Sequence, residues 1–299
     1  MNFKKIFTAT LMIALAIGGF AQQVITVEQG PKEMSKGSRH AFTVIVPEAK
    51  LKKVQKEWID YKKKGSKGKV VEINGEHILN GAVNKNISAT PFLIHSKFLE
   101  TQEGVRLTVF ISQNDSLEFS RDPASDHNIA ASKYVRDFAV STYRDVVQEQ
   151  LDAENEKLGK LKEELADLRK EEDKSIKNIS AAKRDISKCE VNTASAKSEI
   201  LGKIGQITTQ KDVVARLNNS LGNEQKEAQK TLKGLEDDKK KLEKNVEKMS
   251  KDIDKSNEEI RNEERNIDES KRKQNAKEKD IDSQKAEVQK AEQKLKGIN

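Results

Sequence analysis

The chain has 299 residues, of which 34% are hydrophobic, 35% are charged and only 4% are aromatic. This composition excludes one large globular core and is typical of a long polar helix joined to a small domain. The formal net charge of +7 comes mainly from one lysine-rich segment, so the charge describes a local feature and not a uniformly basic protein.

Residues 1–21 have the pattern of a secretory signal peptide. Lys4 and Lys5 precede an apolar run over residues 6–20, and cleavage is expected after Ala21. An uncleaved membrane anchor is the alternative, but it requires about 20 apolar residues and different flanks. The sequence therefore predicts an exported chain, periplasmic or secreted, that has no transmembrane segment after cleavage.

Residues 22–124 are expected to form an α+β domain. Short β-branched runs predict strands at 24–28 and 41–47, and Asn74-Gly75 predicts a type I′ turn within 69–79. A second hairpin is expected over 91–112, which makes about six strands. Between the second and third strands, Leu51, Val54, Trp58 and Tyr61 share one side of a helix. The predicted fold is a small antiparallel sheet with a covering helix.

Residues 125–299 are expected to form a long α-helical coiled coil. Asp122-Pro123 offers an N-cap and a first helical position. Apolar residues then recur every seven positions, from Leu158 to Met249 in one column and up to Leu295 in another. The phase between the columns changes near Gly202 and Gly205, which predicts a local change in supercoiling.

The segment NNSLGN at 218–223 decides between two arrangements of this tract. Its Asn, Ser and Gly residues favour a turn. If the chain folds back there, positions whose numbers add to about 440 face each other, and apolar mostly meets apolar. The pattern favours an antiparallel helical hairpin over a parallel dimeric rod.

No residues are spaced like a catalytic, cofactor or metal site. The segment GSKGK at 65–69 lacks the spacing and the hydroxyl of a phosphate-binding loop. The four histidines are scattered, and the single cysteine, Cys189, falls in an apolar column. We therefore expect a protein that is not an enzyme and has no cofactor. An interchain disulfide through Cys189 is the alternative interpretation of that residue in an oxidising compartment.

The lysine cluster at 50–69 is the best candidate site. It holds nine lysines against Glu57 and Asp60, and it is either a solvated helix face or a binding site for anionic lipid, lipopolysaccharide or nucleic acid. The residues predicted to bind anions are Lys52, Lys53, Lys56, Lys62, Lys63, Lys64, Lys67 and Lys69.

Heptads such as LGKLKEELADLRKEED and KKLEKNVEKMSKDID resemble in composition the coiled-coil arms of structural-maintenance-of-chromosomes and DNA-repair ATPases. That resemblance would imply ATP-linked DNA repair, but the ATP-binding motifs of the family are absent. The chain also resembles exported bacterial proteins that join a short α+β domain to a coiled-coil tail.

The first functional hypothesis is a non-enzymatic exported protein whose coiled coil is a spacer or an arm that binds a partner. The partner is a second copy of the chain or another protein. The second is a polyanion-binding module that uses the lysine cluster.

Overall fold

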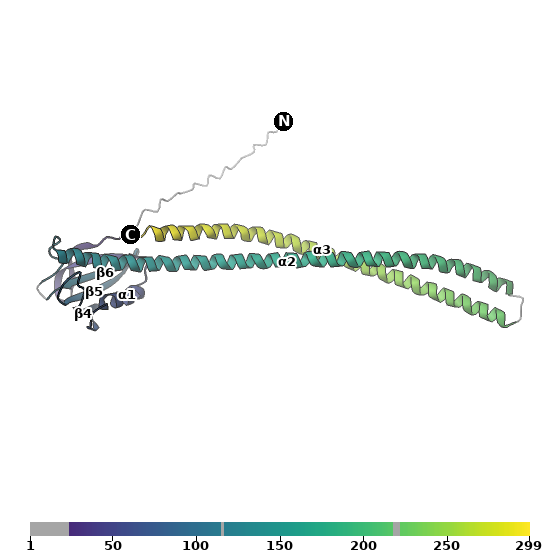
Figure 1. Ribbon diagram of the computed structural model, residues 1–299, viewed down its shortest axis with the longest axis horizontal. Helices are drawn as coiled ribbons and strands as arrows, with labels where there is room; N and C mark the ends of the chain where they lie inside the picture. Colours follow the sequence, from purple (N-terminus) through teal and green to yellow (C-terminus); the bar gives the residue numbers. More distant parts are fainter. Residues whose placement is uncertain (1–23, 115–116, 218–221) are drawn as a thin grey trace, which may run out of the picture. The chain divides into compact units, whose positions relative to one another are not determined.

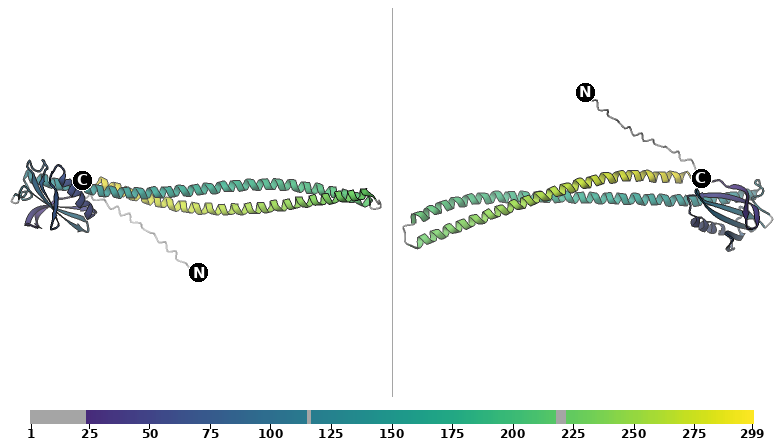
Figure 2. Two further views of the ribbon diagram at one scale, coloured as in Figure 1. Left: turned by 90° about the horizontal axis from the view of Figure 1, so that it is seen from below. Right: turned by 180° about the vertical axis from the view of Figure 1, so that it is seen from behind.

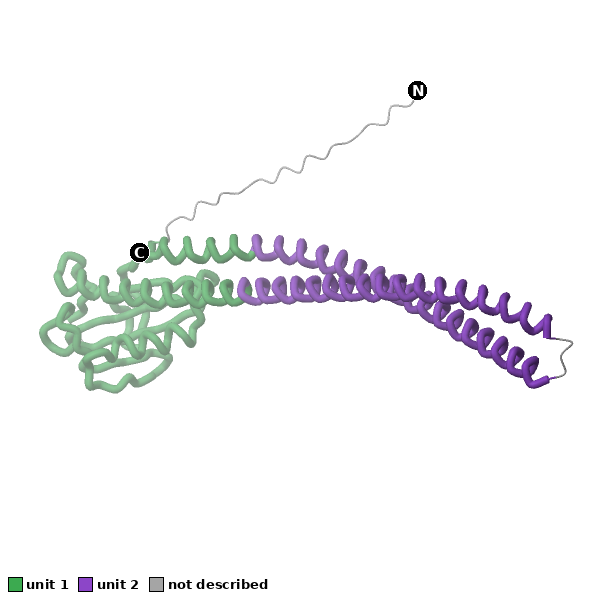
Figure 3. The backbone as a smooth tube through the Cα atoms, turned by 45° about the vertical axis from the view of Figure 1, so that its right-hand side comes forward, with its two compact units in different colours: residues 1–157, 284–299 green, residues 158–283 purple. Residues whose placement is uncertain are grey.

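A computed structural model describes residues 24–114, 117–217 and 222–299. Two compact units divide the chain: unit 1 holds residues up to 157 together with 284–299, and unit 2 holds residues 158–283. Figure 3 colours the two units separately. The boundary predicted at residue 124 differs from this division, because the first part of the long helix and the end of the chain both belong to unit 1.

Unit 1 is built on a six-stranded antiparallel sheet with the order β1-β2-β6-β5-β4-β3. Part of the sheet and α1 are labelled in Figure 1. The element bounds are β1 Glu28–Met34, β2 Gly37–Pro47, α1 Leu51–Lys63, β3 Val70–Ile73, β4 Glu76–Ala82, β5 Phe92–Thr101 and β6 Gly104–Ser112. The order of two strands, a helix and four strands agrees with the prediction, and so does the α+β class.

One face of the sheet carries the hydrophobic core. Alternate residues of the central strands, such as Ile94 and Leu107, are buried together with Trp58 of α1 and Phe138 of α2 (Asp126–Arg216). The apolar side predicted for α1 is confirmed, since Val54 and Trp58 are fully buried. The covering layer therefore consists of α1 and the first part of α2.

The strand predicted at 24–28 is wrong in position. The observed β1 begins at Glu28 and contains Gly30 and Pro31, and it pairs with β2 alone. An edge strand tolerates proline because one of its sides needs no backbone donor. Of the β-branched residues before Glu28, Ile25 is buried in the core and Val27 packs against it, whereas Val24 is 60% exposed.

The predicted turn between β3 and β4 is confirmed, and the predicted N-cap of α2 is wrong. Asn74 and Gly75 both have positive φ, 53° and 75°, as a type I′ turn requires. The cap of α2 is Ser125, whose Oγ accepts a hydrogen bond from the Asn128 amide at 3.2 Å. Asp122 instead accepts from the Ala124 amide, in a turn that precedes the helix.

The C-terminus returns to the core of unit 1. Ile298 follows α3 (Asn223–Lys296) and is only 1% exposed. Arg144 donates a hydrogen bond to the Ile298 carbonyl oxygen at 2.8 Å, and Arg136 donates to the Asn299 carbonyl oxygen at 2.9 Å. The two arginines and the apolar side chain thus fix the end of the chain on α2.

Unit 2 is an antiparallel pair formed by α2 and α3, which lie side by side in Figures 1 and 2. Contacts between the helices join residues whose numbers add to about 440, as expected for the hairpin. Lys203 pairs with Asp238 at 3.1 Å, and Asn178 donates to Glu263 at 2.8 Å. The predicted helical hairpin is therefore confirmed. Most of its predicted turn, at 218–221, and the predicted signal peptide lie outside the described residues.

None of the described helices is long and apolar enough to cross a membrane.

Candidate functional site

The structure divides the predicted lysine cluster into three groups. Lys52, Lys56, Lys63, Lys64, Lys67 and Lys69 are exposed on α1 and the loop that follows it. Lys53 is held by carboxylates, at 2.7 Å from Glu149 and 3.8 Å from Glu57. Lys62 is buried. Six of the eight residues predicted to bind anions are therefore exposed to solvent.

The loop that carries Lys64, Lys67 and Lys69 is anchored to the domain. Ser66 Oγ accepts a hydrogen bond from the Val83 amide at 2.9 Å. Gly68 lies so close to β4 that a Cβ atom there would be 2.4 Å from the Asn80 carbonyl oxygen. The glycine is therefore required for this approach, and it fixes the backbone from which the three lysine side chains project.

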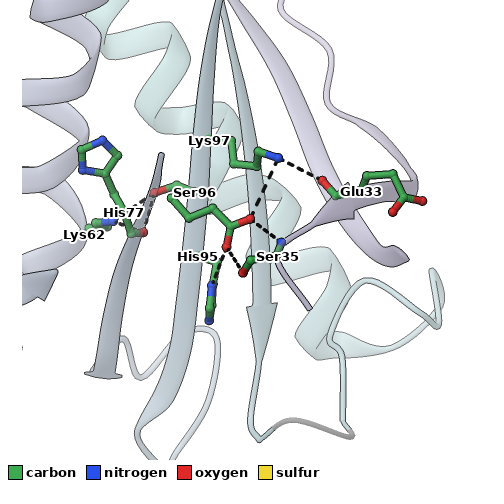
Figure 4. Close-up of polar contacts among 8 residues, drawn as sticks. Glu33, Ser35, Lys62, His77, His95, Ser96 and Lys97 are labelled. Atoms are coloured by element: carbon green, nitrogen blue, oxygen red, sulfur yellow. Dashed lines mark hydrogen bonds and ion pairs between the residues drawn. The ribbon is translucent and has the colours of Figure 1, made fainter. Parts of the chain in front are cut away.

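Lys62 is among the residues predicted to bind anions, but its side chain does not lie at the surface with the others. Its side chain enters the interface between α1 and the sheet, where its exposed fraction is 2%. Lys62 Nζ donates to the His77 carbonyl oxygen at 2.8 Å and to Ser96 Oγ at 3.0 Å, and Figure 4 shows these contacts. Burial lowers the pKa of Lys62 to about 7, because transfer from water disfavours the charged form.

A second polar cluster, around Glu76, was not predicted. Glu76 is 1% exposed and accepts hydrogen bonds from the Ser35 amide at 2.7 Å and the Ser35 hydroxyl at 2.8 Å. Its Oε2 also lies 3.4 Å from His95 Nδ1, and Lys97 Nζ is 3.9 Å from its other oxygen. Figure 4 shows Ser35, His95 and Lys97 around this carboxylate. The cluster ties the β1–β2 turn to β4 and β5.

The pKa of Glu76 reflects two opposing causes. Burial by itself would raise the pKa, but the two hydrogen bonds from Ser35 and the contact with His95 hold it below its usual value. The carboxylate is therefore ionised in the folded protein at neutral pH.

The Ser35, His95 and Glu76 side chains do not form a nucleophile relay. In such a relay the imidazole lies between the hydroxyl and the carboxylate, so that it can take the hydroxyl proton. Here the carboxylate lies between the other two groups and accepts from the hydroxyl. This arrangement joins the β1–β2 turn to β4 and β5 through the carboxylate.

His77 and His95 lie on opposite faces of the sheet. His77 pairs with Ser96 and His95 pairs with Ile78 in the β4–β5 register, and adjacent residues of a strand point to opposite sides. His77 packs edge-on against Phe98, and burial lowers its pKa against the opposing effect of Glu72. Among the described residues no group of three His, Cys, Asp or Glu side chains is arranged to hold a metal ion.

A groove of unit 1 lies beside the exposed lysines. It has a volume of about 430 Å³ and is lined by residues of α1, the β4–β5 connection and α2. Tyr61 and Tyr134 form its aromatic wall, each donating its hydroxyl to the carbonyl oxygen of the other at 3.3 and 3.4 Å. Lys64 lines the same groove, so an anionic group bound by the loop lysines would have an aromatic surface next to it.

Unit 2 contains a polar layer where apolar residues are replaced by small polar ones. Ser175 and Ser270 are buried, at 8% and 7% exposure. Ser270 donates to the Leu168 carbonyl oxygen at 3.0 Å, and Gln274 donates to Glu172 at 2.7 Å. In this layer, side-chain hydrogen bonds between the two helices take the place of apolar contacts.

Comparison with known proteins assigns no family: no family model matches the chain, and no curated protein is similar to it in sequence.

Proposed function

We propose that the protein is a non-enzymatic exported protein in which the helical hairpin of unit 2 is a spacer or an arm that binds a protein partner. The observation that carries this proposal is the return of Ile298 to the core of unit 1. Both α2 and α3 run from unit 2 into unit 1 without an intervening loop. A hairpin connected by two continuous helices suits a mechanical or scaffolding role better than a flexible tail does.

The surface of unit 2 also supports a role in protein contacts. Its helices extend about 90 Å from residue 158 to residue 216 at 1.5 Å per residue. A paired length of this kind offers a large contact surface and encloses little volume for a small molecule. A groove of about 340 Å³ in unit 2 is lined by polar side chains of the two helices.

Site-specific photocrosslinking in cells that produce the protein tests the proposal. A photoreactive amino acid replaces exposed residues of the hairpin, Lys240 and Lys255, and an exposed residue of unit 1, Glu28, serves as the matched control. We expect adducts of defined mass from the hairpin positions. Adducts from Glu28 alone, with none from the hairpin, would contradict the arm hypothesis.

A second candidate function, binding of polyanions, is favoured by the fixed loop that carries Lys64, Lys67 and Lys69. Together with Lys52, Lys56 and Lys63 of α1 these residues make six exposed cations, and none of them has an acidic partner among the described residues. Phosphate groups of an anionic lipid or of lipopolysaccharide are suitable ligands for such a group.

Co-sedimentation with vesicles tests the second candidate. Lys63→Glu/Lys64→Glu/Lys67→Glu should abolish binding to vesicles that contain anionic lipid, and binding by the unchanged chain should weaken steeply as salt rises. The matched control is Lys226→Glu/Lys230→Glu/Lys233→Glu on α3, which changes the net charge equally. Equal binding by both triple variants would remove the lysine cluster as the site.

A further inference from the structure

A narrow strip on the outward side of α2 carries no charged residue over six turns of unit 2. Ala196 and Ile207 are buried against α3, and Lys203 pairs with Asp238 of α3. At 100° per residue, the positions opposite to these are uncharged from Ser187 to Thr209. We name this strip the uncharged face; it consists of Ser187, Val191, Ala194, Ser198, Leu201, Gly202, Gly205 and Thr209, all exposed, and Glu190 lies at its edge.

The uncharged face contrasts with the rest of the hairpin. In a chain that is 35% charged, exposed positions of α2 outside this stretch are held by residues such as Glu163, Lys170 and Lys177. Within it, Val191 is 67% exposed and Leu201 is 70% exposed. Exposed large apolar side chains on a strip that lacks charge, within an otherwise charged surface, are a feature of interaction sites.

The order of large and small residues along the face fits a second copy of the same face in antiparallel orientation. With a twofold axis at Ser198, Val191 of one chain lies level with Gly205 of the other. Leu201 then lies one residue, about 1.5 Å along the helix, from the level of Ala194. Each large side chain meets a small residue, as close packing of two helices requires. A parallel pairing would instead place Val191 on Val191 and Gly205 on Gly205.

Charges at the two ends of the face favour the same orientation. The antiparallel arrangement places Arg184 level with Asp212 of the other chain, and the symmetry makes this pair twice. Both residues are exposed. In a parallel pairing Arg184 would face Arg184, so the like charges would repel. Charge and shape therefore select one register.

We propose that two copies of the chain associate through the uncharged face as an antiparallel dimer with its twofold axis at Ser198. The inference deepens the proposed function, since it names a second copy of this chain as a partner of the arm. The proposed dimer also excludes an interchain disulfide through Cys189. The twofold axis at Ser198 places the two cysteines about 27 Å apart along the helices at 1.5 Å per residue.

Sedimentation equilibrium on the chain from residue 22 measures the association. We expect a concentration-dependent dimer, and Leu201→Glu should raise the dissociation constant by more than about tenfold. The matched control, Lys233→Glu on α3, should leave it unchanged. Because Leu201 is 70% exposed, the substitution leaves the contacts within the hairpin intact. A monomer at every concentration up to about 200 µM would overturn the proposal.

A charge exchange tests the register independently of folding. Arg184→Asp and Asp212→Arg should each raise the dissociation constant by about three- to tenfold, because each places like charges at both ends of the face. The double variant restores opposite charges and should restore the affinity. Failure of the double variant to recover would contradict the antiparallel register.

Cysteine crosslinking gives the orientation directly. In a Cys189→Ser background, Val191→Cys chains mixed with Gly205→Cys chains should form a disulfide-linked heterodimer on oxidation, whereas Val191→Cys chains alone should not. Crosslinking of Val191→Cys alone would indicate parallel pairing and overturn the proposal. A monomeric protein that still gives hairpin adducts with another protein in the photocrosslinking experiment would refute the dimer and leave the proposed function standing.

Discussion

Lys62 Nζ lies 3.0 Å from Ser96 Oγ in an interface that excludes water, and no carboxylate of the described residues pairs with it there. The hydroxyl of Ser96 also donates to the His77 carbonyl oxygen at 3.0 Å. That carbonyl therefore keeps a hydrogen bond if the lysine is removed. The methylene groups of Lys62 pack favourably in the interface, whereas the burial of its amino group is unfavourable.

The variant Lys62→Met should be more stable than the unchanged chain at pH 7, by at least about 2 kcal/mol. The folded pKa is lowered to about 7 from 10.5, so between these values the unfolded state binds a proton that the folded state lacks. The stability of the unchanged chain thus rises with pH through this window, and the advantage of the variant shrinks toward pH 10.5. Urea unfolding, followed by the fluorescence of the single tryptophan, Trp58, measures the free energy of unfolding and its pH dependence.

Lys63→Met is the matched control, since Lys63 is exposed on the same helix. It should change neither the stability nor its pH dependence. A Lys62→Met variant that is destabilised equally at pH 7 and pH 10 would show that the amino group is a net stabilising contact.

The variant Glu76→Gln should destabilise unit 1 by about 2 kcal/mol at pH 7, because the Ser35 amide and hydroxyl and His95 lose a charged acceptor. The folded pKa of Glu76 is lowered, so its contribution is present above the usual glutamate value and is lost as the pH falls through the folded pKa. The difference between variant and unchanged chain should therefore narrow below pH 4.5. Glu100→Gln, at an exposed position of β5, should show no such difference at any pH.

The variant Ile298→Ala should destabilise unit 1 by about 2 to 4 kcal/mol, because it leaves a cavity in the core. Lys296→Ala, two residues earlier and exposed, is the control. Equal unfolding curves for the two variants, followed through Trp58, would show that the C-terminus contributes nothing to the core.

Filling the polar layer of unit 2 should raise its thermal stability. Ser175→Leu/Ser270→Leu replaces two buried hydroxyls with apolar side chains and should stabilise the hairpin by about 1 to 3 kcal/mol. Thermal unfolding monitored by helical circular dichroism measures the change, with Ser180→Leu at an exposed position as the control. A lower melting temperature for the double variant would mean that the hydrogen bond from Ser270 to the Leu168 carbonyl oxygen outweighs apolar packing.

Features with strong local chemistry were predictable from the sequence. Asn74-Gly75 specified its turn because both residues tolerate positive φ. The hairpin register followed from heptads that meet when the chain folds back near residue 220, as the Lys203–Asp238 pair confirms. Both depend on residues close in sequence or on a repeated pattern.

Features that depend on tertiary context were missed or misplaced. Lys62 follows Val54 and Trp58 at intervals of four, which places it on the buried side of α1; its charge masked that signal in the sequence. Glu76 follows a turn, where a carboxylate is ordinarily solvated, and its burial depends on Ser35, which is 41 residues away. The ending Gly297-Ile298-Asn299 has no periodicity that would predict its place in the core.

The buried position of Ile298 depends on how α3 is aligned with α2. A slip of α3 against α2 by one heptad would preserve most apolar pairing but displace the end of the helix by about 10 Å at 1.5 Å per residue. Ile298 would then miss its site, and the carbonyl oxygens that Arg136 and Arg144 bind would move away. The burial of Ile298 and the hydrogen bonds from Arg136 and Arg144 therefore favour the observed alignment of α3 with α2 over a slipped one.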